Sequence, residues 1–138
     1  MDRSSFDREV AAGGFLEWAE FLGHLYGTPR PRPPAGSDVL LEIDLQGARQ
    51  VVREFPEATV VLLLAPSEAE EAARMRRRGD PPEQVARRLD KAREEVAGGR
   101  ELAAAEVVND DLDQAVAQVA AIIAAVRSAR TEPAHTDQ

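Results

Sequence analysis

The 138 residues carry a net charge of −8, include no cysteine and are 43% apolar. This composition favours one soluble domain with its own core, and it excludes disulfides and thiolate metal sites. The acidic balance argues against binding along a nucleic-acid backbone. We find no leader-like or membrane-spanning pattern, so we expect a cytoplasmic protein that binds neither nucleic acid nor membrane.

The first part of the chain predicts a short helix and a small β-hairpin. Ser4 or Ser5 is placed to cap the helix, which ends at the glycine pair Gly13-Gly14. Residues 15–21 and 24–26 follow as two strands. The next segment, residues 29–37, carries four prolines and is predicted to be a loop.

From residue 38 the pattern alternates between strands and helices. Residues 39–43 predict a short buried strand, residues 46–55 a helix, and residues 59–65 a second buried strand. A strand, a helix and a strand at this spacing predict a βαβ unit and therefore a parallel sheet.

The rest of the chain predicts three helices and one more strand. Ser67-Glu-Ala-Glu70 is a capping box for a helix that stops at Gly79. The remaining predicted segments are a helix from Asp80 to about residue 97, a strand at 106–109, an amphipathic helix over 112–126 and a disordered tail over 131–138.

A carboxylate and two hydroxyls stand close together in the predicted hairpin. Glu17 lies among apolar and aromatic residues, where it can accept two parallel hydrogen bonds from a flat donor pair such as the N1 and N2 edge of guanine. An exposed glutamate on an edge strand is the alternative. Tyr26 and Thr28 follow at close spacing, although Tyr26 alone fits a core aromatic and Thr28 alone the start of a loop.

Asp44 directly follows the predicted strand 39–43. Ligands of open parallel sheets bind beyond the carboxyl ends of the strands, so an acid at this position is a site candidate. Asp44 is also placed to cap the next helix, and both roles remain open.

Three arginines are candidates for a phosphoryl clamp. Arg74 and Arg78 share a helix face, and Arg88 lies on the following helix. The alternative is a solvated face paired with Glu68, Glu70, Glu71 and Glu83. Asn109 follows the last predicted strand, where it either contacts a ligand or caps the final helix with Asp110 or Asp111.

Several of these segments together resemble guanylate kinases, the family that phosphorylates GMP with ATP. The similar stretches are Phe15-Leu-Glu-Trp-Ala-Glu, Tyr26-Gly-Thr28, Val39-Leu-Leu-Glu-Ile-Asp-Leu-Gln-Gly-Ala48, Met75-Arg-Arg-Arg-Gly-Asp80, Ala86-Arg-Arg-Leu89 and Val107-Val-Asn-Asp110. The resemblance implies an α/β fold with a three-layer parallel sheet of the P-loop nucleoside monophosphate kinase type. It also implies a small GMP-binding hairpin and a mobile helical lid.

The resemblance assigns roles to the candidate residues. It implies GMP binding by Glu17, Tyr26, Thr28 and Asp44, with Asp44 also near the transferring phosphate. It implies a catalytic lid of Arg74, Arg78 and Arg88, and it brings Asn109 close to the adenosine of ATP. Mg²⁺ is expected to accompany ATP, with no direct protein ligand identified.

The resemblance covers residues 6 to 127, and no Gly-x-x-x-x-Gly-Lys-Ser/Thr phosphate loop occurs in the 138 residues. We therefore expect an N-terminally truncated, incomplete sheet that self-associates and has no turnover of its own. An inactive binding or scaffold module, or a truncated remnant, is the alternative. The predicted parts are a GMP-binding segment (1–28), a proline-rich link (29–37), a core (38–66 and 104–130) and a lid (67–98).

Overall fold

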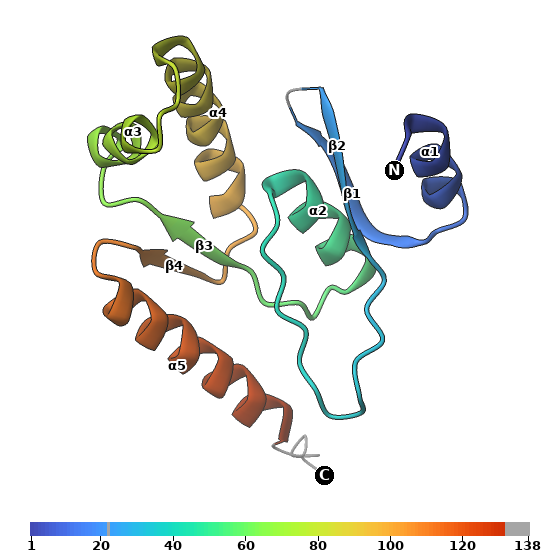
Figure 1. Ribbon diagram of the computed structural model, residues 1–138. Coiled ribbons are helices and arrows are strands. Elements are labelled where there is room, and N and C mark those ends of the chain that lie inside the picture. The colour runs from blue at the N-terminus through green and yellow to red at the C-terminus, as the bar shows by residue number, and fades with distance from the viewer. Residues whose placement is uncertain (22, 132–138) are drawn as a thin grey trace. The chain divides into compact units, whose positions relative to one another are not determined.

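The computed structural model describes residues 1–21 and 23–131 and divides the chain into two compact units, Met1–Ala58 and Thr59–Gln138. Figure 1 shows the elements of both units. The boundary at residue 58 falls inside the segment that we assigned to one core. The predicted tail, residues 131–138, lies outside the described residues except for Thr131, which ends the last helix.

The first unit begins with a helix, α1 (Arg3–Ala11), whose cap differs from our prediction. The carboxylate of Asp2 caps it by accepting the backbone N–H of Ser5 at 2.7 Å. The hydroxyls of Ser4 and Ser5 instead accept hydrogen bonds from the Arg8 guanidinium at 2.8 and 2.9 Å. The capping prediction was wrong because Asp2, one turn earlier, supplies a stronger charged acceptor.

The predicted hairpin is confirmed. Strands β1 (Phe15–Phe21) and β2 (His24–Pro29) pair antiparallel, so β2 is longer than we expected. Phe6 of α1 is buried against the hairpin, with its ring centroid 4.7 Å from that of Phe15 and 6.2 Å from that of Trp18. The helix therefore anchors one end of the hairpin through one tilted and one edge-on contact between aromatic rings.

The predicted helix after Asp44 is confirmed as α2 (Leu45–Glu54), which packs on β1. The strand that we predicted over residues 39–43 is not formed, and Val39 and Leu40 are 44% and 79% exposed. An apolar run becomes a strand only when a neighbour completes its hydrogen-bond ladder. In residues 1–21 and 23–58 the sheet consists of β1 and β2 alone, so residues 39–43 have no strand to pair with.

The second unit contains a parallel pair of strands, although its partners differ from those that we predicted, because residues 59–65 were expected to pair with residues 39–43. Strand β3 (Val61–Leu64) pairs in parallel with β4 (Ala105–Val108), and helices α3 (Glu68–Arg77) and α4 (Pro82–Arg100) connect them. The long helix α5 (Leu112–Thr131) follows β4. The predicted class, an α/β fold with an incomplete parallel sheet, is confirmed.

The turn between α3 and α4 follows the sequence signals closely. Ser67 caps α3 by accepting the Glu70 N–H at 3.1 Å, and Gly79 ends the helix at a φ of 90°, a conformation that glycine adopts without strain. Beyond it, Pro82 occupies the first position of α4, as its missing N–H favours. Ala72 and Met75 of α3 are buried with Val85 of α4 in a small core.

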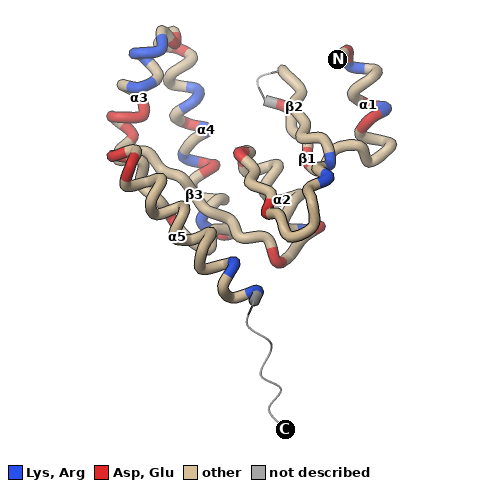
Figure 2. The backbone as a smooth tube through the Cα atoms, turned by 60° about the horizontal axis from the view of Figure 1, so that its bottom comes forward, with Lys and Arg blue, Asp and Glu red and all other residues tan. Residues whose placement is uncertain are grey.

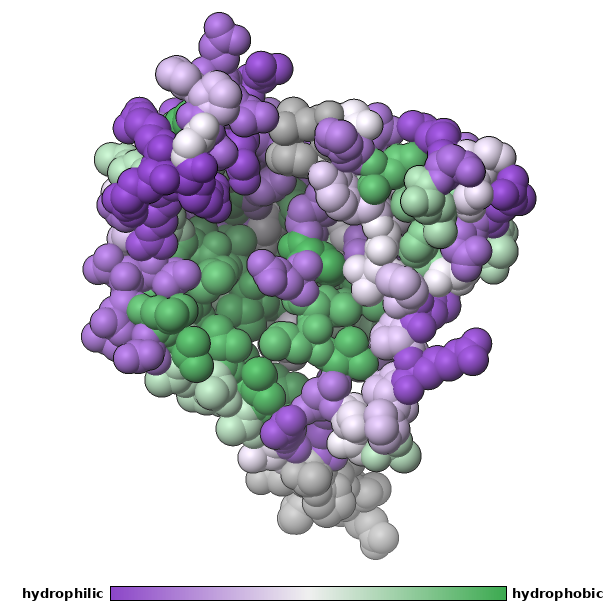
Figure 3. All heavy atoms as spheres, viewed as in Figure 1, coloured by the Kyte–Doolittle hydropathy of each residue, from purple (hydrophilic) through white to green (hydrophobic). Residues whose placement is uncertain are grey.

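The strand pair is packed on one side and exposed on the other. Val107 of β4 is 1% exposed, and a Cβ at Gly99 would lie 2.8 Å from Leu62 Cδ1, so this glycine lets α4 approach β3 closely. Apolar side chains gather over β3, β4 and α5 in Figure 3. The large ones that are at least 46% exposed are Leu63, Val108, Leu112 and Val116. Our prediction of self-association concerns this surface and stays a prediction.

Helix α5 bears on our expectation that no segment spans a membrane. Among the described residues it is one helix that is long and apolar enough, by length and composition alone, to cross a bilayer. The core helix of a soluble protein passes the same test, so this property by itself argues little for a span.

Candidate functional site

The β-hairpin holds Glu17 as a buried carboxylate. Glu17 is only 6% exposed although it lies next to Trp18, which is 40% exposed. It pairs across the hairpin with Thr28, whose hydroxyl donates to Glu17 Oε1 at 2.5 Å. The structure therefore brings two of the predicted guanine-binding residues into direct contact, with one orienting the other.

The first turn of α2 lies against this carboxylate. Asp44 caps the helix by accepting the Gly47 N–H at 2.9 Å, which confirms the capping role that we considered for it. A Cβ at Gly47 would lie 2.9 Å from Glu17 Cδ, so only glycine leaves room for Glu17 here. The positive end of the helix dipole also favours a carboxylate at this position. Asp44 and Glu17 are thus linked through Gly47.

Tyr26 shares a face of the hairpin with these residues. Side chains alternate along a strand, and Tyr26 pairs with Ala19 two residues from the Glu17–Thr28 pair. The side chain is 54% exposed and its ring lies edge-on to His24, with 6.4 Å between centroids. Tyr26 is therefore available at the surface beside the buried pair.

The three predicted lid arginines bind two different sets of acceptors in the second unit. Arg74 donates to Glu70 Oε1 at 3.1 Å and to the backbone oxygen of Asn109 at 3.0 Å. Arg78 and Arg88 both contact Asp80 Oδ2, at 3.7 and 3.2 Å. Of the three candidates for a phosphoryl clamp, the structure brings Arg78 and Arg88 together on one carboxylate, whereas Arg74 is held at the end of β4.

Asp80 is the residue that sequence reasoning missed in this region. Its side chain is 18% exposed, and one carboxylate oxygen receives guanidinium groups from both helices. Its backbone N–H donates to the Met75 carbonyl at 3.2 Å, which ties it to the end of α3. A single acid at the turn between two arginine-bearing helices is the signal that would have identified it.

Other arginines in this unit make the surface ion pairs that we considered as the alternative. Figure 2 shows acidic and basic residues interspersed along α3 and α4. Hydrogen bonds from Arg77, and secondarily from Arg74, lower the pKa of Glu70. The hydrogen bond from Arg93 lowers the pKa of Glu68 in the same way. Glu68 and Glu70 were among the predicted partners, so part of the arginine cluster is a paired helical surface.

The backbone of Asn109 extends the strand pair. Its N–H donates to the Leu64 carbonyl at 2.8 Å, and its carbonyl accepts Arg74. Helix α5 is capped by Asp111, which accepts the Gln114 N–H at 2.9 Å. The cap that we considered for this region therefore belongs to Asp111, and the contact of Asn109 with ATP stays a prediction.

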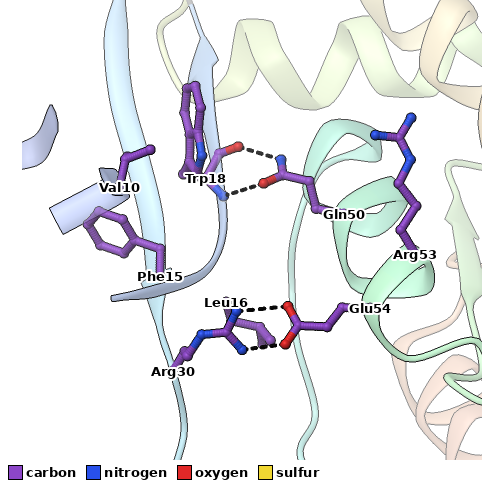
Figure 4. Close-up of a pocket in the computed structure, with 8 residues that line it drawn as sticks. All are labelled: Val10, Phe15, Leu16, Trp18, Arg30, Gln50, Arg53 and Glu54. Atoms are coloured by element: carbon purple, nitrogen blue, oxygen red, sulfur yellow. Dashed lines mark hydrogen bonds and ion pairs between the residues drawn. The ribbon is translucent and has the colours of Figure 1, made fainter. Parts of the chain in front are cut away.

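A pocket of about 400 Å³ opens in the first unit beside α2, lined by Val10, Phe15, Leu16, Trp18, Arg30, Gln50, Arg53 and Glu54. Figure 4 shows Arg30 and Glu54 facing each other there, with Nη1–Oε1 and Nη2–Oε2 separations of 2.5 and 2.8 Å. This paired contact lowers the pKa of Glu54 and raises that of Arg30. Glu17, Thr28 and Asp44 do not line this pocket.

The comparisons with known proteins concern the family and the fold of the chain. The family model described as guanylate kinase matches residues 1–126. A guanylate kinase of Synechococcus is 53% identical over 122 residues, which are 85% of this chain and 65% of that protein. A guanylate kinase of Thermus thermophilus is 48% identical over 132 residues, which are 92% of this chain and 60% of that protein.

The fold is similar to that of a solved relative. The crystal structure of guanylate kinase from Anaplasma phagocytophilum matches with a TM-score of 0.70 and 28% identity, over 96% of this chain and 64% of that one. The chain thus spans 60 to 65% of the length of the two curated relatives. On the family match and these identities, the chain belongs to the guanylate kinase family.

Proposed function

We propose that this chain carries the GMP-binding and lid parts of guanylate kinase-type phosphoryl transfer, in which GMP and ATP give GDP and ADP, and that its 138 residues do not include the phosphate loop for ATP. The observation that carries the proposal is the buried carboxylate of Glu17, oriented by the Thr28 hydroxyl and admitted by Gly47. Burial of an ionised group is costly unless hydrogen-bond donors satisfy it, so a buried carboxylate favours a ligand that brings such donors. A guanine base supplies a matching pair of N–H donors, which adenine lacks.

The other residues of the hairpin face complete a GMP site. Glu17 Oε1 accepts the Thr28 hydroxyl, and each carboxylate oxygen retains a further lone pair for the base. Thr28 therefore holds the Glu17 side chain in the orientation that binds the base. The exposed Tyr26 on the same face binds the GMP phosphate. Asp44, at the first turn of α2, lies beside the bound nucleotide.

The arginines of the second unit act as the lid. Phosphoryl transfer depends on positioning and on charge stabilisation, and guanidinium groups provide both. Arg78 and Arg88 already share one carboxylate, so their guanidinium groups are held near each other before phosphate arrives. Arg74 is tied to the backbone of Asn109, so it links the lid to the strand end assigned to the adenosine of ATP.

ATP is expected to bring Mg²⁺ with it. Within residues 1–21 and 23–131 no three His, Asp or Glu side chains form a metal-binding group. Mg²⁺ commonly keeps water ligands and binds substrate phosphates with few protein carboxylates. Bound there, the ion would neutralise phosphate charge, and the protein would supply the arginines. We place this activity in the cytoplasm.

Calorimetry of the 138-residue chain with GMP and with AMP tests the proposal. We expect binding to favour GMP, and we expect Glu17→Gln to weaken GMP binding by about 1–3 kcal/mol, because an amide N–H then faces a donor of the base. Glu20→Gln is the matched control, since Glu20 is an exposed acid on the same strand. Equal affinities for GMP and AMP, unchanged by Glu17→Gln, would contradict the proposal.

A further inference from the structure

Two glutamines of α2 bind the backbone of β1. The side-chain amide of Gln50 donates from Nε2 to the Trp18 carbonyl at 2.6 Å and accepts the Trp18 N–H on Oε1 at 3.2 Å. Figure 4 shows these two bonds side by side. Gln46 adds a longer bond of 3.5 Å from Nε2 to the Glu20 carbonyl. Gln50 thus binds Trp18 as a neighbouring strand would.

The spacing of these contacts follows from the geometry of a helix and a strand. Positions 46 and 50 are one helical turn apart, so they share a face of α2 and are separated by about 6 Å along its axis. Residues 18 and 20 are separated by about 6.8 Å along the strand, and alternate residues direct their N–H and C=O groups to the same edge. Because these two repeats nearly match, one face of α2 follows the free edge of β1.

The contact of Gln50 with Trp18 also restrains the neighbouring residue, Glu17. The Trp18 N–H belongs to the peptide bond that joins Glu17 to Trp18, so the 3.2 Å bond to Gln50 fixes the backbone of Glu17 on its carboxyl side. On its side-chain end, Glu17 meets Gly47 and Thr28. Gly47 and Gln50 lie on the same helix. The distance between α2 and β1 therefore determines where the Glu17 carboxylate lies between them.

We propose that Gln50 is a positioning residue for base recognition, holding β1 at the distance from α2 at which Glu17 reads guanine. The inference rests on the proposed function of Glu17. Gln50 needs no contact with the nucleotide for this role. It needs both a donor and an acceptor on one side chain of this length, which among the helix-forming residues glutamine supplies.

Two variants and one control test this role in the full chain. Gln50→Ala removes both bonds, and Gln50→Glu keeps the shape and the acceptor but cannot donate to the Trp18 carbonyl. Gln118→Ala is the matched control, because Gln118 is an exposed glutamine on α5. The measurements are calorimetry with GMP and AMP and amide hydrogen exchange of Trp18, with the β3–β4 amides as the internal reference for folding.

We expect both Gln50 variants to lower the GMP-to-AMP affinity ratio by roughly three- to tenfold, the range for losing one or two net hydrogen bonds. Faster Trp18 exchange should accompany this loss in Gln50→Ala, with unchanged exchange in β3 and β4. Gln118→Ala should change neither quantity.

The outcomes separate this inference from the proposed function. Wild-type preference for GMP that survives Gln50→Ala, despite faster Trp18 exchange, would overturn the positioning role and leave the proposed function intact. Equal loss of GMP and AMP binding would mean that Gln50 only maintains the fold, which also overturns it. A wild-type chain without preference for GMP would overturn the proposed function, and the specificity role of Gln50 with it.

Discussion

The two units hold their candidate functional side chains in different ways. In the first unit Glu17 is 6% exposed and is held by a hydroxyl, a glycine and the packing of α2 on β1. In the second unit the side chains of Arg74, Arg78 and Arg88 are 34%, 59% and 36% exposed and are held by carboxylates or a backbone carbonyl. One set is fixed by shape and the other by exchangeable ion pairs.

The difference matches two physical tasks. Discrimination between bases requires a donor and acceptor pattern that does not adjust, because a group that relaxes accepts the wrong base as well. A phosphate clamp must open and close, and exposed ion pairs are worth only about 0–1 kcal/mol, so a phosphate can displace their carboxylates. The first unit therefore suits recognition, and the second suits a lid.

The largest expected effect comes from a substitution of Gly47 in the first unit. Gly47→Ala should cost about 1–3 kcal/mol of GMP affinity, because the new methyl group displaces the Glu17 carboxylate. By helix propensity alone, the same change would raise the folding stability by about 1 kcal/mol. A loss of GMP affinity would therefore not be explained by a weakened helix. Calorimetry with GMP measures the affinity.

A double variant provides the control for Gly47. In a Glu17→Ala background the added methyl group meets no carboxylate, so Gly47→Ala should then be neutral or stabilising in thermal unfolding. If Gly47→Ala lowered thermal stability equally with and without Glu17, the added methyl group would clash with a group other than the Glu17 carboxylate. That result would contradict the view that Gly47 leaves room for this carboxylate.

A smaller effect is expected in the second unit, where ion pairs hold the arginines. Hydrogen exchange over residues 70–97 should slow several-fold when a GMP–ATP bisubstrate analogue is added, because the lid orders around phosphate. The double change Arg78→Ala and Arg88→Ala should abolish this slowing. The matched control is Arg76→Ala with Arg87→Ala, on the same two helices. Equal slowing in the two double variants would contradict the assigned lid residues.

The smallest effect concerns pH and the Arg30–Glu54 pair. The folded-state pKa of Glu54 is lowered by Arg30, so the pair's contribution to stability is complete above the unfolded carboxyl pKa of about 4.3. The contribution is lost as pH falls through the folded pKa. Thermal unfolding between pH 7 and pH 3 should therefore show a slightly smaller acid loss in Glu54→Gln than in the wild type. The same acid loss in both would argue that the pair contributes nothing measurable.

Local signals in the sequence predicted local structure well. The hairpin, the Ser67 cap, the stop at Gly79 and the closing helix depend on neighbours within a few residues, and all four are confirmed. The strand over residues 39–43 was wrong because a strand requires a partner that an apolar run does not specify. Asp2 displaced the serine caps because two competing capping residues stood within one turn.

The sequence suggested the acids and arginines of the candidate site, whose roles stay predictions, but it did not suggest the contacts that support them. Glu17 and Thr28 stand out as polar residues in an apolar hairpin, and the structure brings them together. Gln50 and Asp80 do not stand out, because glutamine and aspartate are common on exposed helices and turns. Gln50 gains its role only when α2 packs on β1, and Asp80 only when two helices pack at a turn. Such packing cannot be read from a pattern along the sequence.

The bonding of α2 to β1 also affects how the chain meets other proteins. A hairpin edge with unpaired N–H and C=O groups is a template on which a strand of another molecule can add. At Trp18 both groups are occupied by Gln50, and the Glu20 carbonyl is occupied by Gln46. A foreign strand would have to break these bonds before pairing, so α2 protects this edge of β1 against aggregation.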